Sequence, residues 1–138
     1  MGAALELATA LTDAYNICKE YGQGVTFNIR EEGDVARDNY RSIVARPTAT
    51  SLAVYCYPVL YSPTERDLVR AGLKEMMDVV IYAPTLAFAN AKLSWGDLDP
   101  IRSTVVVDGQ TLKVREKARI SQFLNGWLYY TFGLRITG

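Results

Sequence analysis

Four basic residues in the last quarter of the chain are the side chains best placed for chemistry, and that chemistry is the binding of anions. One residue separates each from the next: Lys113, Arg115, Lys117 and Arg119. Alternate residues of a strand point to the same face, so we expect the first three to share one face, with Arg119 following. Such a stripe is either the solvated face of a half-buried hairpin or, repeated around a ring of subunits, a channel lining suited to a phosphate backbone. It does not imply reading of a base sequence.

The side chain that catalysis uses most often as a general base is missing. The sequence contains no histidine, which excludes Ser-His and Cys-His nucleophile pairs. Cys18 and Cys56 stand far apart in apolar surroundings, so we expect two buried thiols rather than zinc ligands or a disulfide. No glycine-rich phosphate loop or nucleophile elbow occurs. We therefore predict a protein that is not an enzyme, with no catalytic residue, no cofactor and no metal site.

Two groups of carboxylates need a separate interpretation. Glu31, Glu32 and Asp34 lie in a polar stretch that lacks the alternating oxygen ligands of a calcium loop. Asp97 and Asp99 flank a turn before a proline, where carboxylates commonly cap the backbone. We expect a solvated loop and a turn, rather than a cation site and an acid/base pair.

Length and charge limit the class of protein. The chain has 138 residues, with 15 Lys plus Arg and 15 Asp plus Glu, for a formal net charge of zero. This length suits one domain, and no overall field directs the chain toward nucleic acid or membrane. The N-terminus lacks the basic flank and apolar run of a signal peptide, and no stretch is long and apolar enough to span a membrane. We expect no membrane partner.

The elements expected before residue 100 combine one helix with short strands. Residues from about 3 to 21 form an amphipathic helix, and residues 25–30 alternate as a half-buried strand. Residues 51–57 are dense in strand-forming types, so we expect a strand covered on both faces. A short helix begins with Ser62 as its cap and ends near Gly72, before a strand over 76–83.

Two tight turns organise the C-terminal part. Asp108-Gly109 joins strands over 103–107 and 110–117, because Asp-Gly accepts the positive φ angles of a type I′ turn. By the same argument, Asn125-Gly126 joins strands over 120–124 and 127–136. The sequence therefore predicts a mainly β fold: a small β-barrel or sandwich in a single domain, residues 1–138. It has an N-terminal amphipathic helix, one or two short helices, and a β-meander over about 103–136.

Aromatic residues occupy both faces of the last predicted strand: Trp127, Tyr129, Tyr130 and Phe132. A strand with two apolar faces in so small a domain either lies centrally or meets another subunit. We therefore name these four residues as a possible subunit interface.

The layout from Asp67 to the end of the chain resembles a known family. A helix leads to the strand Asp78-Val79-Val80-Ile81-Tyr82-Ala83. The hairpin Ser103-Thr104-Val105-Val106-Val107-Asp108-Gly109-Gln110-Thr111-Leu112-Lys113-Val114 and a long closing strand follow. This order is similar to that of the head-to-tail neck proteins of tailed bacteriophages. The likeness is greatest to the head-closure, or stopper, group of small β-barrels.

The resemblance implies a structural virion protein, made in the host bacterial cytoplasm, that completes the head and connects it to the tail. Its partners would be other copies of itself in a ring (a hexamer or dodecamer), portal or adaptor proteins, tail proteins, and packaged double-stranded DNA bound without sequence preference. A loop in such proteins narrows the channel, and residues 31–42 and 85–99 are candidates here.

Two other interpretations stay open. The N-terminal helix is longer than in the simplest stopper proteins, which leaves room for a tail terminator. From a different class, the aromatic residues would line the cavity of a small-molecule-binding barrel. A ligand that co-purifies in that cavity would favour the second alternative.

Overall fold

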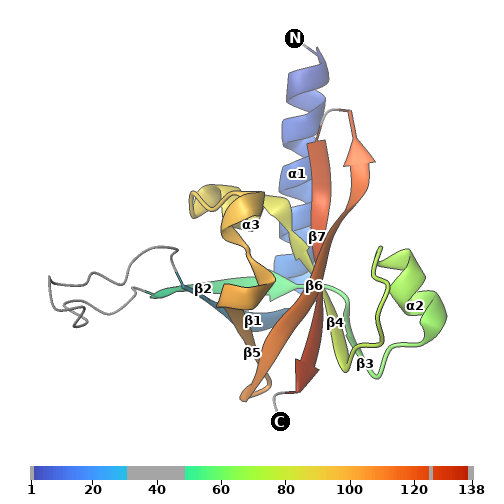
Figure 1. Cartoon of the computed structure of the whole chain (residues 1–138). Helices are drawn as coiled ribbons and strands as arrows, with labels where there is room; N and C mark the ends of the chain where they lie inside the picture. The colour runs from blue at the N-terminus through green and yellow to red at the C-terminus, as the bar shows by residue number, and fades with distance from the viewer. Residues whose placement is uncertain (1, 31–48, 125, 137–138) are drawn as a thin grey trace, which may run out of the picture.

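A seven-stranded antiparallel sheet is the framework of the computed structural model, which describes residues 2–30, 49–124 and 126–136. Its order is β2-β1-β5-β6-β7-β4-β3 (Figure 1). The strands are β1 Gln23–Arg30, β2 Ala49–Cys56, β3 Val59–Tyr61, β4 Val79–Pro84, β5 Ser103–Val107, β6 Gln110–Phe123 and β7 Gly126–Ile136. The helices are α1 Gly2–Tyr21, α2 Glu65–Arg70 and α3 Thr85–Asn90, with the 3-10 turns η1 Trp95–Asp97 and η2 Pro100–Arg102. The predicted mainly β fold with an N-terminal helix and a few short helices is confirmed.

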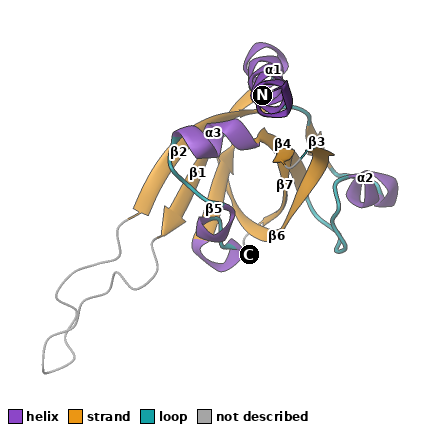
Figure 2. Cartoon of the chain, turned by 90° about the horizontal axis from the view of Figure 1, so that it is seen from above, coloured by secondary structure: helices purple, strands orange, loops and turns teal. Residues whose placement is uncertain are grey.

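The two edge strands of the sheet are consecutive in the chain, which makes the sheet curl. β2 ends at Cys56 and β3 begins at Val59, so Tyr57 and Pro58 carry the chain from one edge to the other. The Tyr57 N–H donates to the Tyr82 carbonyl (3.0 Å), and the Tyr82 N–H donates to the Pro58 carbonyl (3.2 Å). Seen from above, the strands surround a common interior (Figure 2). The fold is barrel-like, although no continuous ladder closes it, because β2 and β3 remain edges.

Aromatic rings fill that interior. Phe27 from β1, Phe88 from α3 and Phe132 from β7 are fully buried or nearly so. The Phe27 ring centroid lies 5.2 Å from that of Phe88 and 5.0 Å from that of Phe132, both in edge-on geometry. Since α3 supplies one of the three rings, it packs into the interior of the sheet. In the segment 85–99, Phe88 and Leu98 are both buried in this core.

Helix α1 packs through the stripe that its sequence periodicity predicts. Ala14 and Cys18 are buried, and Leu7, Leu11 and Tyr15 are partly buried on the same side. Cys18 and Cys56 are both free and buried, as expected. Burial raises the pKa of the Cys18 thiol, and raises that of Cys56 further above its usual range. Both groups therefore behave as small apolar side chains.

A second, smaller core lies on the outer face of the sheet. Leu68 and Ala71 of the α2 segment pack with Leu73, Met77 and Val80. The helix begins two residues later than predicted: Thr64, not Ser62, caps it. The Thr64 side chain accepts from the Asp67 N–H, and the Asp67 side chain accepts from the Thr64 N–H.

The predicted turns are half right. Asp108 (φ 51°) and Gly109 (φ 77°) both have positive φ and join β5 to β6, which confirms the first hairpin. In the second, Phe123 pairs with Gly126, so Gly126 belongs to β7 and the turn begins one residue early at Leu124, with φ 56°. Asn125 lies outside the described residues. β6 also runs unbroken over fourteen residues, where the sequence suggested two strands.

β2 differs from the prediction as well. Ser51, Ala53 and Tyr55 are exposed, because β2 is an edge of the curled sheet and only its inner face is covered.

Among the described residues, no helix has both the length and the apolar character needed to cross a membrane.

The step from α1 to β1 leaves no room for a side chain at Gly22. A Cβ there would collide with the Cys18 carbonyl oxygen and lie 2.5 Å from the Cys56 carbonyl oxygen, both of which are backbone atoms. We predict that Gly22→Ala lowers the free energy of unfolding by about 2 kcal/mol, as overpacking in a rigid site does. The control is Gly96→Ala, whose Cβ would meet nothing closer than 3.9 Å. Urea denaturation of both variants checks this, and equal stabilities would contradict it.

Candidate functional site

A β-bulge in β6 divides the four predicted cations between the two faces of the sheet. Val114 pairs with Leu134, but Glu116 pairs with Gly133, so Arg115 is an extra residue in β6. Lys113 lies opposite exposed Arg135, whereas Lys117 lies opposite buried Phe132. One inserted residue reverses the side of every residue that follows. The prediction that Lys113, Arg115 and Lys117 share one face is therefore wrong.

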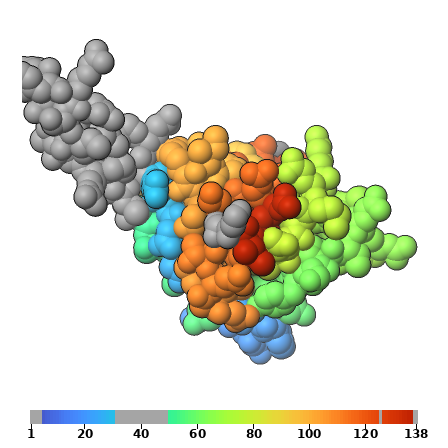
Figure 3. All heavy atoms as spheres, turned by 60° about the horizontal axis from the view of Figure 1, so that its bottom comes forward, coloured from blue at the N-terminus to red at the C-terminus, as the bar shows by residue number. Residues whose placement is uncertain are grey.

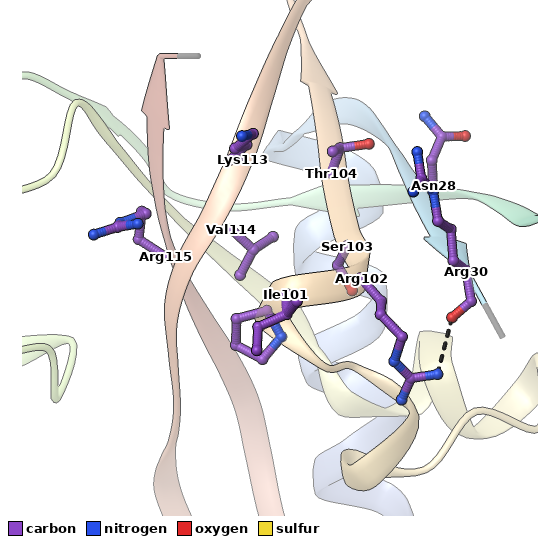
Figure 4. Close-up of a pocket in the computed structure, with 10 residues that line it drawn as sticks. Asn28, Arg30, Ile101, Arg102, Ser103, Thr104, Lys113, Val114 and Arg115 are labelled. Carbon is purple, nitrogen blue, oxygen red and sulfur yellow. Dashed lines mark hydrogen bonds between the residues drawn. The ribbon is translucent and has the colours of Figure 1, made fainter. Parts of the chain in front are cut away.

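Lys113 and Arg115 line an open basic groove on the outer face of β1, β5 and β6. The groove has a volume of about 680 Å³. Figure 4 shows the side chains that line it. We call it the basic groove and define it by its lining: Asn28, Arg30, Pro100, Ile101, Arg102, Ser103, Thr104, Lys113, Val114 and Arg115. Among these described lining residues, four are cationic and none is acidic. The lining is therefore suited to a ligand of negative charge.

Strand register explains how cations distant in sequence meet there. Ile29 pairs with Ser103, so the next step along both strands brings Arg30 beside Arg102. The Arg102 Nη1 donates to the Arg30 carbonyl at 3.1 Å, and the Arg102 Nε lies 3.4 Å from an Asp99 carboxylate oxygen. Within the described residues, neither Lys113 nor Arg115 forms a salt bridge. Their charge is available to a partner.

Lys117 and Arg119 belong to a different cluster, built around two tryptophans. The Lys117 Nζ lies 4.1 Å from the Trp95 ring centroid and donates to the Trp95 carbonyl. Burial lowers the pKa of the Lys117 ammonium. The Arg119 guanidinium lies 5.1 Å from the Trp95 ring and 5.4 Å from the Trp127 ring. Lys117 is therefore held by the protein, whereas Arg119 is exposed and stacked.

The aromatic residues named as a possible interface have different environments. Phe132 is 1% exposed in the core, so its assignment to an interface is wrong. Tyr130 is partly buried against Trp95 (4.8 Å between centroids) and Phe88 (5.6 Å). Trp127 and Tyr129 are half-buried, and their role in an interface stays a prediction.

The carboxylates near residue 98 act as caps, as expected. Asp97 accepts from the Ser94 N–H (2.8 Å) and hydroxyl (2.9 Å), and these bonds lower its pKa. Asp99 accepts from the Ile101 N–H at 3.0 Å. The acidic stretch with Glu31, Glu32 and Asp34 lies outside the described residues, as does the segment 31–42.

Sequence reasoning missed Arg30 and Arg102 as partners of Lys113 and Arg115. Each stands alone in its own segment, and only the pairing of β1 with β5 and of β5 with β6 joins them. The alternation of cations along β6 was visible, but no glycine or proline marks the bulge at Arg115.

The described residues include no group of three or more Cys, Asp or Glu side chains placed to hold a metal ion. No protein-family model, curated protein or solved structure matches this chain.

The different environments of the two lysines predict different effects on stability. Lys117→Gln removes a cation–aromatic contact and a hydrogen bond to a backbone carbonyl, so we expect a loss of about 1 kcal/mol in the free energy of unfolding. Lys113→Gln, at an exposed position, should change it by less than about 0.5 kcal/mol. Urea denaturation followed by tryptophan fluorescence measures both. A loss for Lys113→Gln as large as that for Lys117→Gln would contradict this division.

Proposed function

We propose that this chain is a structural protein of the neck of a tailed phage, where copies form a ring that joins head to tail and helps to retain packaged DNA. The observation that carries the proposal is a projecting arm with an apolar tip. The distal parts of β6 and β7 extend away from the rest of the sheet beside α1 (Figure 1). The side chain of Leu7 lies against Gly126, which fixes the helix to the arm.

Apolar side chains are exposed at the end of this arm and on the neighbouring helix α1. Phe123 is 37% exposed and Leu124 is 45% exposed at the turn, and Leu5 on α1 is 69% exposed. Projecting apolar side chains are typical of surfaces that bind other proteins. In the proposed neck they would contact portal, adaptor or tail proteins, which would place the chain in the virion.

Arg119 is the best candidate for contact with DNA inside such a ring. Lys117 already donates to a backbone carbonyl, whereas Arg119 is exposed. A guanidinium that stacks on indole rings keeps its N–H edge free for phosphate oxygens. The contact would be independent of base sequence and weaker at high salt.

The filled interior argues against the small-molecule-binding barrel. Phe27, Phe88 and Phe132 occupy the space that a ligand would need.

The tail terminator remains the structural alternative. It would bind tail proteins without binding the portal or adaptor, so pull-down with each purified partner separates the two roles.

The proposal predicts assembly. Native mass spectrometry and negative-stain microscopy should find rings of the chain, alone or with purified portal or adaptor protein. A monomer under every condition, including high concentration and added neck proteins, would overturn the proposal.

If the arm docks the neck partners, replacing its apolar tip with polar residues should weaken their binding. Phe123→Ser with Leu124→Ser should reduce binding to the neck partners at least about tenfold, since exposed apolar anchors contribute most of the affinity of an interface. The matched control is Val69→Ser, which alters an exposed apolar residue on α2. Circular dichroism verifies that the variants fold, and equal binding by both variants would exclude the arm as a docking element.

A further inference from the structure

We propose that the basic groove of one copy receives the exposed acidic face of α1 from a second copy. The contact is head-to-tail, and it rests on the proposed self-assembly. The described lining of the groove holds four cations and no acidic residue, and its occupant is inferred from charge, spacing and the apolar residues at its rim.

The acidic face of α1 is regular. Glu6, Asp13 and Glu20 recur every seven residues, which is close to two helical turns, so all three lie on one side of the helix. All three are exposed, and none of them forms a salt bridge within the described part of the chain. We call this set the acidic stripe. It offers the negative charge that the described lining of the groove does not contain.

The spacing of the two surfaces agrees. Asp13 and Glu20 are seven residues apart, or about 10.5 Å along the helix at about 1.5 Å per residue. Arg30 on β1 and Arg115 on β6 are separated by β5, which is two strand spacings, or about 9.6 Å. Two carboxylates one heptad apart therefore match cations at the two sides of the groove.

Apolar residues favour a protein in the groove over nucleic acid. Ile101 is 93% exposed and lines the groove beside Pro100 and Val114. A phosphate backbone makes no use of an exposed isoleucine, whereas a protein surface buries it. On α1, Ile17 is 45% exposed and lies on the helix between Asp13 and Glu20. Both surfaces thus carry an apolar residue between charges of one sign.

The two surfaces cannot meet within one chain. Viewed from above, α1 and β5 lie on opposite sides of the interior (Figure 2). In the space-filling view, the orange β5–β6 hairpin adjoins the light-blue β1, and the blue α1 lies at the lower margin (Figure 3). A contact between different surfaces of identical chains is heterologous, and it closes into a ring when the rotation between neighbours permits.

Charge reversal tests the contact. One variant carries Lys113→Glu with Arg115→Glu, and the other carries Asp13→Lys with Glu20→Lys. Each alone should shift from rings to monomers in native mass spectrometry, because groove and helix then repel. An equal mixture should assemble again, since each variant supplies the surface that complements the other. Assembly of the unchanged chain should weaken as salt rises, because the screening length falls from about 10 Å at about 0.1 M to about 3 Å at about 1 M.

The control is Arg66→Glu with Lys74→Glu, which changes the net charge by the same amount as the groove variant, at exposed positions on the α2 side, and should leave assembly intact. Circular dichroism confirms folding of every variant. Rings formed by the groove variant alone, or a mixture that stays monomeric, would overturn the inference while leaving the proposed function in place. So would a groove variant that forms rings but no longer binds double-stranded DNA, which would assign the groove to nucleic acid. An unchanged chain that never assembles would overturn both proposals.

Discussion

The constraint on which the rest of the structure depends is the short connection between the two edges of the sheet. Two residues, Tyr57 and Pro58, separate β2 from β3, although five strands lie between them in the sheet. A flat sheet cannot satisfy that connection, so the strands curl and enclose an interior. The curl decides which faces are buried against Phe27, Phe88 and Phe132 and which remain outside for the basic groove. It also leaves β2 and β3 as edges rather than as a closed ladder.

Within the curled sheet, one extra residue, Arg115, divides the cations of β6 between the two faces. Up to Arg115, the cations of β6 lie on the outer face, and beyond Glu116 the alternation puts Lys117 and Arg119 on the face that carries Phe132 and Tyr130. Glu116 gains a structural role in exchange, because it accepts hydrogen bonds from the Lys74 and Glu75 N–H groups (3.0 to 3.2 Å). Lys117 becomes part of the aromatic cluster. Lys113 and Arg115 on β6 therefore line a surface groove, whereas Lys117 on the same strand packs against Trp95.

Local patterns in the sequence were sufficient for local structure. The stripe from Leu7 to Cys18 predicts α1, the alternation through Phe27 predicts β1, and Asp108-Gly109 predicts the hairpin that is observed. Apart from the cap of α2, which is Thr64 and not Ser62, the errors arise where pairing between distant segments decides. Nothing near Arg115 signals a bulge, and the one-residue shift of the second turn depends on the register of β6 with β7. Arg30 and Arg102 join the groove only through β5, so no inspection of a single segment could have found the complete candidate site.

The bulge at Arg115 also bears on how such a surface can change over evolution. A substitution at any one cation removes or adds a single charge. Deleting one residue from this part of β6 would instead rotate the whole distal strand and exchange its two sets of side chains. This strand should therefore tolerate single substitutions on its outer face but not insertions or deletions. The spacing between Val114 and Glu116, more than the identity of any basic residue, would be the inherited feature.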